Sequence, residues 1–302
     1  MRRRLAALLA PAVALAGGLA GCGVDLPGLS SGTSGSAIPD VTPPPPSAPV
    51  TGPAPAPACT ITGASRHDRR CEAKAIDRGA AYVATHLGDM DATSLALPDY
   101  LDRRWGLSVF DGAHALALRD PTAATPANPF VRLVDPHVLP AKKVVRASTG
   151  GELFLAEMLS CDARPVGPAL VPVFRQALRQ GGSAATHALW GLKFAAELGC
   201  RLPAGISVDA AAHTVAAELR RSTVVDDLSA QQATYLALLG HGTDVPADWV
   251  RRAVASQLAD GSWKHDGPDL APQQEDWHTT ALVVWSLLLL TRPDAPDPGM
   301  IR

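Results

Sequence analysis

Apolar residues recur three or four positions apart in three segments of the chain. These segments are residues 72–88, 207–221 and 244–258. The spacing is that of one face of an α-helix, so each segment is expected to form a helix that covers a larger body with that face. Gly88 can end the first helix, Ser207 can cap the second, and Pro246 fits the start of the third.

Between these segments lie stretches that are apolar on nearly every side. They are residues 110–118, 150–159, 185–199, 230–240 and 276–290. A helix that is apolar all round must be buried on every side. The last stretch is too short to span a membrane and is interrupted by Thr279, Thr280 and Ser286, so we interpret it as a core helix.

The alternation of half-polar and apolar helices predicts an all-α domain. Similar apolar stretches return roughly every 35 to 48 residues, the length of a helix pair with its loops. This pattern favours an α/α toroid or open arc of about four to five hairpins, with buried inner helices and amphipathic outer ones. We place the domain at residues 59–292 and expect a flexible tail at residues 293–302.

Residues 1–22 have the pattern of a bacterial lipoprotein signal. Arginines at positions 2–4 precede an apolar run over residues 5–20, and the sequence LAGC ends at Cys22. This ending resembles the lipobox, which implies that the cysteine carries acyl chains such as palmitate and becomes the mature N-terminus. An ordinary secretory signal with a chance cysteine is the alternative. The pattern predicts an extracytoplasmic protein held on the cell membrane by lipid.

Residues 23–58 predict a linker rather than a packed element. The segment is rich in proline, glycine and serine, and its proline run favours extended polyproline II. Such a linker would hold the folded domain away from the membrane. Binding of the proline run to an aromatic groove is the alternative interpretation.

Charge and motifs exclude several classes of function. The formal net charge is −2, and loss of the signal arginines makes it about −5, so nucleic acid is not an expected partner. The signatures GxSxG, SxxK and HExxH and a glycine-rich phosphate loop are all absent. We expect no metal and no cofactor, and we assign no catalytic residue.

Four cysteines remain when Cys22 is assigned to lipid. An even number of cysteines in an exported domain indicates two disulfides, and three pairings are open. Free thiols or a metal site are the alternative, although the chain has no CxxC pair. The four residues are Cys59, Cys71, Cys161 and Cys200.

The stretch QLADGSWKHDG, residues 257–267, carries a family resemblance. Gln257, Gly261 and Trp263 end an amphipathic segment and precede a Thr-Ala-Leu helix. They resemble the QW motif of the terpenoid cyclase and protein prenyltransferase α/α-toroid superfamily, and the resemblance to that fold covers residues 72–291. It implies that the glutamine amide bonds backbone groups at a helix end, that the tryptophan stacks on it, and that the glycine permits the turn. We therefore interpret the three residues as a structural clamp.

The resemblance also favours one disulfide pairing. Consecutive inner helices of such a ring run parallel, so their C-terminal ends share a rim. Cys161 and Cys200 each follow an inner helix, and short loops on one rim can bring their Cα atoms to the roughly 5.5–6 Å that a bridge needs. The remaining pair, Cys59–Cys71, closes a short loop at the start of the domain.

The resemblance does not extend to the catalytic residues of the superfamily. The DxDD acid motif of squalene-hopene type cyclases is absent, and Asp226-Asp227 is only a pair, which we interpret as a cap for the helix from Ser229. The zinc-binding Asp/Cys/His set of protein prenyltransferases is also absent, because the cysteines are committed to disulfides. The sequence therefore favours a protein without catalysis.

Polar residues at the N-terminal ends of the inner helices are the candidate ligand-binding residues. Convergent helix N-termini with polar side chains can hold a polar or anionic ligand. A buried histidine whose hydrogen bonds are satisfied within the core is the alternative for His114 and His187. The set is Asp111, His114, Glu152, His187, Gln231, Asp276 and His278.

A second group of polar residues precedes the last helix. Carboxylates beside histidines can carry out acid–base chemistry or bind a metal. The alternative is a solvated loop in which Glu275 and Asp276 stabilise the positive end of that helix. The group is His265, Asp266, Asp269, Glu275, Asp276 and His278.

These observations favour a lipid-anchored domain that binds a small molecule or a cell-envelope partner without catalysis. The alternatives are a hydrolase, lyase or cyclase that uses a carboxylate–histidine cluster in a central cavity, and a purely structural envelope protein. Convergence of Asp276, His278 and another acid within about 4 Å in a deep pocket would favour the enzyme.

Overall fold

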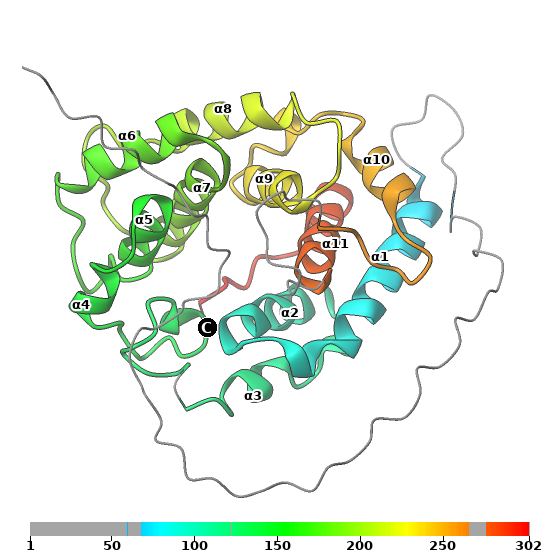
Figure 1. Ribbon diagram of the computed structural model, residues 1–302, viewed down its shortest axis with the longest axis horizontal. Helices are drawn as coiled ribbons and strands as arrows, with labels where there is room; N and C mark the ends of the chain where they lie inside the picture. Colours follow the sequence, from blue (N-terminus) through cyan, green and yellow to red (C-terminus); the bar gives the residue numbers. More distant parts are fainter. Residues whose placement is uncertain (1–58, 60–67, 122, 266–275, 302) are drawn as a thin grey trace, which may run out of the picture. The chain divides into compact units, whose positions relative to one another are not determined.

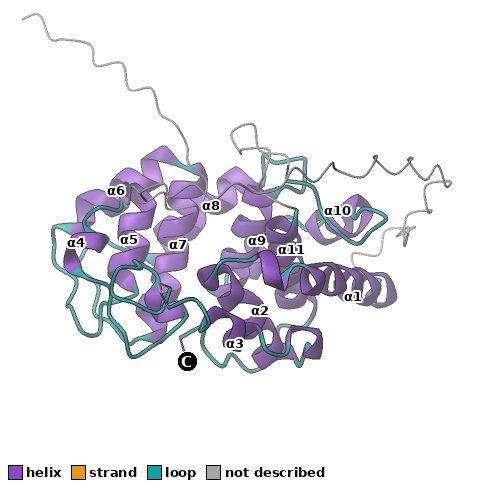
Figure 2. Cartoon of the chain, turned by 60° about the horizontal axis from the view of Figure 1, so that its bottom comes forward, coloured by secondary structure: helices purple, strands orange, loops and turns teal. Residues whose placement is uncertain are grey.

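The computed structural model describes residues 59, 68–121, 123–265 and 276–301, and the statements below refer to these residues. They contain helices and loops but no strand, which confirms the all-α prediction for the described part of the chain (Figure 2). All of them belong to one compact unit. Cys22 and the predicted linker at residues 23–58 lie outside the described residues.

Eleven α-helices follow one another through this unit (Figure 1). They are α1 (Arg69–Thr85), α2 (Ala92–Trp105), α3 (Ala113–Ala117), α4 (Lys142–Val145), α5 (Gly150–Met158), α6 (Leu170–Gln180), α7 (Gly182–Glu197), α8 (Val208–Leu219), α9 (Asp227–Leu238), α10 (Trp249–Ser256) and α11 (Trp277–Thr291).

The buried helices pack against one another in chain order. α5 contacts α7, α7 contacts α9, and α9 contacts α11. Residues 279–289 of α11 are all buried, as the apolar character of this segment predicts. α6 and α8 pack against α7 with one face each, while α10 contacts both α1 and α11. The first helix therefore meets the last two.

Three helices were not predicted from the sequence, namely α2, the four-residue α4 and α6. α2 begins after Asp91, whose side chain accepts a hydrogen bond from the Ser94 amide, and it continues through Pro98. Proline normally breaks a helix interior, so this segment did not register as helical. α6 has Pro172 in its first turn, where a proline is tolerated because that amide has no partner within the helix.

Both predicted disulfides are present. Cys59 is bonded to Cys71, with their Cα atoms 5.5 Å apart. Cys161 and Cys200 form the second bond across a Cα separation of 5.9 Å. This bond joins the loop after α5 to the loop after α7, so it ties two successive buried helices at their C-terminal ends.

The C-terminal segment leaves α11 and contacts α2 and α7 (Figure 1). The Asp297 carboxylate accepts hydrogen bonds from the Tyr100 hydroxyl of α2 and the Lys193 ammonium of α7, at 3.1 and 2.8 Å. The Ile301 amide donates to Glu197 of α7 at 2.7 Å. We expected a flexible tail at residues 293–302; its described residues instead make these defined contacts. No described helix combines the length and hydrophobicity that crossing a membrane requires.

Candidate functional site

Gln257 and Gly261 lie where the loop after α10 crosses α1. The Gln257 side-chain amide donates to the carbonyl oxygens of Ala75 and Gly261, each at 2.9 Å. Gly261 has a φ of 100°, and a Cβ at this position would lie 2.6 Å from the carbonyl oxygen of Arg78. The loop can therefore make this close approach to α1 only with glycine.

Trp263 connects three helices in the same region. Its side chain is fully buried, and its indole nitrogen donates to the Ala253 carbonyl of α10 at 2.7 Å. Its backbone amide donates to the Thr280 hydroxyl of α11 at 3.0 Å. The ring lies so close to Gly79 of α1 that a Cβ there would be 2.7 Å from it. We refer to Gln257, Gly261 and Trp263 as the clamp.

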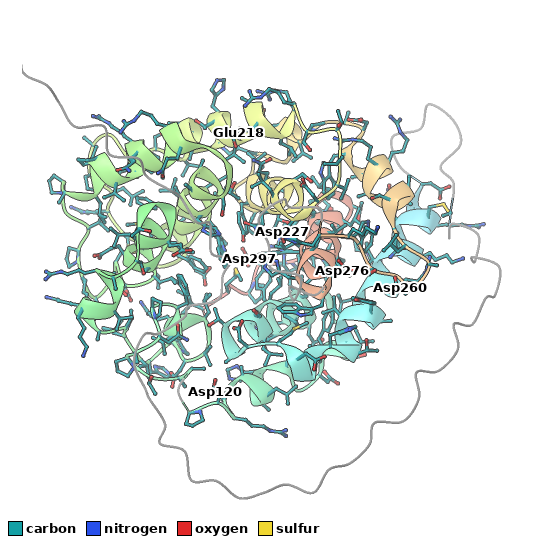
Figure 3. The ribbon with its side chains drawn as sticks, viewed as in Figure 1. Asp120, Glu218, Asp227, Asp260, Asp276 and Asp297 are labelled. Atoms are coloured by element: carbon teal, nitrogen blue, oxygen red, sulfur yellow. A yellow bond between two sulfur atoms is a disulfide. The ribbon has the colours of Figure 1, made fainter. Side chains whose placement is uncertain are left out.

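A second buried arrangement lies at the N-terminal ends of α9 and α11, centred on Asp227 (Figure 3). The preceding residue, Asp226, is the N-cap of α9, and its side chain accepts from the Ser229 amide at 2.8 Å. Because Asp226 provides the cap, the Asp227 carboxylate is free to face α11. One of its oxygens, Oδ1, accepts from His278 Nδ1 at 2.6 Å and from the Thr279 hydroxyl at 3.2 Å.

Gln231 and His265 complete the contacts of this cluster. The Gln231 amide nitrogen, one turn along α9, donates to the other oxygen of Asp227. His265 Nδ1 is 2.8 Å from the Thr279 hydroxyl and 3.6 Å from Asp227. The His265 backbone amide also donates to the Asp276 carboxylate at 3.1 Å. We call Asp227, Gln231, His265, His278 and Thr279 the Asp227 cluster.

Two buried side-chain atoms of the cluster have no hydrogen-bond partner among the described residues. The Thr279 hydroxyl gives its single proton to Asp227, so it must accept from the Nδ1–H of His265. In the neutral ring, Nε2 of His265 then carries the lone pair. Neither this atom nor the Oε1 atom of Gln231 has a hydrogen-bond partner in the described part of the chain. Most buried polar atoms in proteins are paired, so such atoms call for an explanation.

Charges in the cluster stabilise one another. Burial disfavours the charged form of Asp227, but the charge of His278 and its hydrogen bond outweigh that effect and hold the Asp227 pKa well below its usual range. Burial also disfavours charged His278, but Asp227 outweighs that effect and raises the His278 pKa. The two groups therefore form a buried ion pair.

A histidine and an aromatic pair lie beside the cluster on α7 and α9. Burial lowers the pKa of His187 to about 4, an effect that Asp227 opposes and His278 reinforces. One turn later on α7, the half-buried Trp190 stacks on Tyr235, with ring centroids 5.0 Å apart and planes 6° from parallel. The indole nitrogen of Trp190 is buried and lacks a hydrogen-bond partner among the described residues.

The structure brings together part of the predicted ligand-binding set. Gln231 and His278 contact Asp227 directly, and Asp276 contacts the His265 backbone. His187 lies within electrostatic range of Asp227 and His278.

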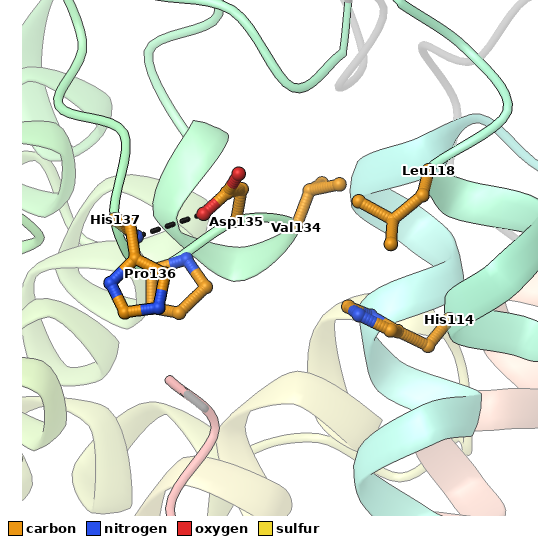
Figure 4. A pocket seen from close by; sticks show the side chains of 6 residues that line it. All are labelled: His114, Leu118, Val134, Asp135, Pro136 and His137. Atoms are coloured by element: carbon orange, nitrogen blue, oxygen red, sulfur yellow. Dashed lines mark hydrogen bonds between the residues drawn. The ribbon is translucent and has the colours of Figure 1, made fainter.

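The other three members of the set lie on other elements. Asp111 is exposed and interacts with Asp102 of α2. Glu152 is in the first turn of α5, where burial raises its pKa. His114 of α3 lines a pocket of about 290 Å³ opposite Asp135 and His137 (Figure 4).

The predicted condition for catalysis is met only in part. The carboxylate–histidine pair is present, but its acid is Asp227 rather than Asp276. A second pocket, of about 320 Å³, lies at the start of α9 and is lined by Asp226, Ser229 and Gln232. Neither this pocket nor the one beside His114 is lined by the Asp227 cluster.

The remaining members of the polar group before α11 cannot be placed. Asp266, Asp269 and Glu275 lie outside the described residues. Within the described ranges, no three His, Cys, Asp or Glu side chains gather in a way that could hold a metal ion.

Asp227 is the residue that sequence reasoning did not identify. We had interpreted Asp226 and Asp227 together as a helix cap, whereas the structure gives that role to Asp226 alone. The i, i+4 spacing of Asp227 and Gln231 was the available signal, because it places two polar side chains on one face of an otherwise apolar helix.

Comparison with known proteins identifies no relative. No protein-family model, curated protein sequence or solved structure matches the chain. Fold alone does not determine function, so the functional argument rests on the chemistry of the site.

Proposed function

We propose that the chain is a lipid-anchored extracytoplasmic protein whose α/α-toroid-like domain binds a ligand at the Asp227 cluster without catalysis. The succession of α5, α7, α9 and α11, each packed on the next, supports a toroid-like arrangement. So does the contact of α1 with α10 and α11, since it joins the two ends of the helical series.

The proposed location follows from the cysteines and the N-terminal sequence. Two disulfides are typical of proteins in an oxidising compartment outside the cytoplasm. The LAGC sequence that ends at Cys22 supports anchoring by lipid. A diacylated cysteine would supply more than one acyl chain, which firm membrane attachment requires.

The observation that carries the binding proposal is a buried ion pair beside polar atoms that lack partners. Burying charged and unpaired polar groups costs stability, and apolar residues of similar size would often serve the fold better. Ligand binding accounts for their presence, because a ligand can supply the missing partners. The side chains of Asp227 and His278 are 15% and 25% exposed, while the unpaired atoms beside them are buried.

One observation favours an enzyme as the second candidate. The Asp227 carboxylate accepts a hydrogen bond from Nδ1 of His278 at 2.6 Å. In many enzymes a carboxylate orients a catalytic histidine through the same kind of bond. The raised pKa of His278 suits a proton donor better than a proton acceptor at neutral pH. A hydrolase, lyase or cyclase of this kind would convert the bound molecule rather than retain it.

Mass spectrometry of the full-length protein extracted from its own membrane tests the proposal. We expect acylation at Cys22 and a co-purified small molecule that is lost in Asp227→Asn. The matched control is Asp244→Asn, which alters a surface carboxylate 3.1 Å from His241 and should retain the ligand.

The same experiment separates the candidates. A bound molecule that changes mass during incubation with wild type, but not with Asp227→Asn, would establish the enzyme. The absence of any co-purified molecule, or equal retention by both variants, would contradict ligand binding at this cluster.

A further inference from the structure

We infer that the Asp227 cluster and the neighbouring Trp190 bind a polyhydroxylated ligand of the carbohydrate type. The inference rests on the proposed binding function and names the chemistry of the ligand. It follows from the kinds of hydrogen-bonding groups left without partners, from the balance of charge, and from the aromatic pair beside them.

The unpartnered groups include both acceptors and a donor. Gln231 is 6% exposed, and because its amide nitrogen must donate to the Asp227 carboxylate, its Oε1 atom remains as an acceptor. His265 adds a second acceptor in its neutral form. The Trp190 indole nitrogen can only donate.

This mixture selects among ligand chemistries. An ammonium group donates hydrogen bonds but cannot accept them, whereas a phosphate or carboxylate mainly accepts. A hydroxyl group does both, so several hydroxyls on one small molecule can satisfy all three atoms. The opposite charges of Asp227 and His278 offset each other, so the cluster has no strong preference for a charged ligand.

The half-buried ring of Trp190, backed by the buried Tyr235, adds an apolar side chain near the polar groups. Trp190 lies one turn beyond His187 on α7, and Tyr235 lies one turn beyond Gln231 on α9. A sugar ring presents an apolar C–H face as well as hydroxyl edges. An aromatic wall beside a few polar groups is a common design of small-molecule sites.

Unpartnered polar atoms elsewhere in the structure do not form such a site. The indole nitrogens of Trp249 and Trp285 also lack partners, but these side chains are 0% and 1% exposed and lie sealed in the core. Gln257 has an unpaired Oε1 atom, but its amide nitrogen is bonded to backbone carbonyls within the clamp. Around Asp227, by contrast, the unpaired atoms of Gln231 and His265 lie beside the partly exposed side chains of Asp227 and His278.

Isothermal titration calorimetry of the full chain, in detergent, tests this inference. The hydroxylated probes are trehalose, chitobiose and inositol, and the comparison probes are phosphate, ethanolamine and dialanine. We expect at least one hydroxylated probe to bind, and we expect Gln231→Leu to weaken its binding at least tenfold.

Gln232→Leu is the matched control. Gln232 is the next residue of α9 and is also buried, but it donates to Glu218 rather than to Asp227. Binding to this variant should stay within twofold of wild type. Trp190→Phe retains an aromatic ring without the indole donor and should weaken binding without unfolding the domain, which circular dichroism would verify.

The outcomes distinguish this inference from the proposed function. Binding of phosphate, ethanolamine or dialanine alone, with loss in Gln231→Leu, would reject the carbohydrate class and leave the binding function standing. Failure of every hydroxylated probe to bind, or equal binding by Gln231→Leu and Gln232→Leu, would overturn the inference.

Discussion

The clamp and the Asp227 cluster are two buried polar arrangements that meet at the start of α11. Thr280 serves the clamp by accepting from the Trp263 amide, while His278 and Thr279 serve the cluster by donating to Asp227. Three consecutive residues of α11 are therefore shared out, one bonded to the clamp and two to the Asp227 cluster. The two arrangements differ in the kind of partner that their side chains use.

In the clamp, the side-chain donors go to backbone carbonyls. The amide of Gln257 and the indole of Trp263 are neutral, so their bonds to Ala75, Gly261 and Ala253 do not depend on pH. In the Asp227 cluster the bonds join side chains, and two of these side chains carry opposite charges. Neutral side chains bonded to the backbone suit a packing role, whereas a buried pair of opposite charges is typical of a functional site.

Trp263→Ala should have the largest effect of the changes considered. The substitution removes a fully buried ring and the bond to Ala253, so we expect a loss of about 3–5 kcal/mol in the free energy of unfolding. Guanidinium denaturation measures this loss. Trp277→Ala, at a half-buried tryptophan beside the Asp227 cluster, is the control and should cost clearly less. Equal losses would mean that the clamp does not join the helices as described.

Asp227→Asn should cost up to about 3 kcal/mol, because it leaves His278 buried without its counter-charge. The effect should depend on pH. The lowered Asp227 pKa stabilises the fold above about pH 4, and this contribution is lost as pH falls through the folded-state value. The raised His278 pKa stabilises the fold below about pH 6.5, and this contribution is lost as pH rises through its folded-state value.

The difference between wild type and Asp227→Asn should therefore be greatest between about pH 4 and 6.5 and should shrink on either side. Urea denaturation across this range measures the difference, and an NMR titration should show a lower His278 pKa in the variant. A difference that stays constant with pH would indicate that Asp227 acts by packing alone, as the clamp does.

Gly261→Ala should cost about 1–3 kcal/mol, because an alanine there adopts a strained backbone conformation and its Cβ meets the Arg78 carbonyl. Thermal denaturation should show a melting temperature lower by several degrees. Gly88→Ala is the control, since no atom lies within 4 Å of a Cβ built there. A normal melting temperature for Gly261→Ala would place the loop farther from α1 than the structure has it.

Asp297→Asn should have the smallest effect, about 1 kcal/mol or less. Asp297 bonds Tyr100 and Lys193, but its side chain is 31% exposed, and exposed ion pairs contribute little. Asp294→Asn, at another exposed position of the C-terminal segment, should be neutral. Differential scanning calorimetry of the two variants compares them. A loss as large as that of Trp263→Ala would make this segment a second clamp.

The clamp and the cluster also differ in how far the sequence predicts them. The clamp residues span seven positions and follow a recognisable spacing, so they could be identified locally. The apolar composition of the segments that form α5, α7, α9 and α11 likewise predicts their burial. The same prediction is wrong for residues 110–118, where only the short α3 forms and Leu118 is 46% exposed.

The sequence predicts the Asp227 cluster less well than it predicts the clamp. Its residues come from α9, α11 and the loop before α11, and what joins them is the packing of α9 on α11. The sequence supplied His278 and Gln231 as candidates, but it offered no reason to separate Asp227 from the capping residue Asp226. That separation depends on which way each side chain points in the folded helix.

The contact of α1 with α10 and α11 bears on how the protein is made. α1 packs against α10 and α11, and α2 contacts the segment that holds Asp297. The first helices of the domain therefore cannot complete their packing until the last helices have been synthesised. A ribosome must release nearly the whole polypeptide before these contacts can form. Until then the new chain cannot complete the packing of α1 and α2, so the domain reaches its final fold only after synthesis ends.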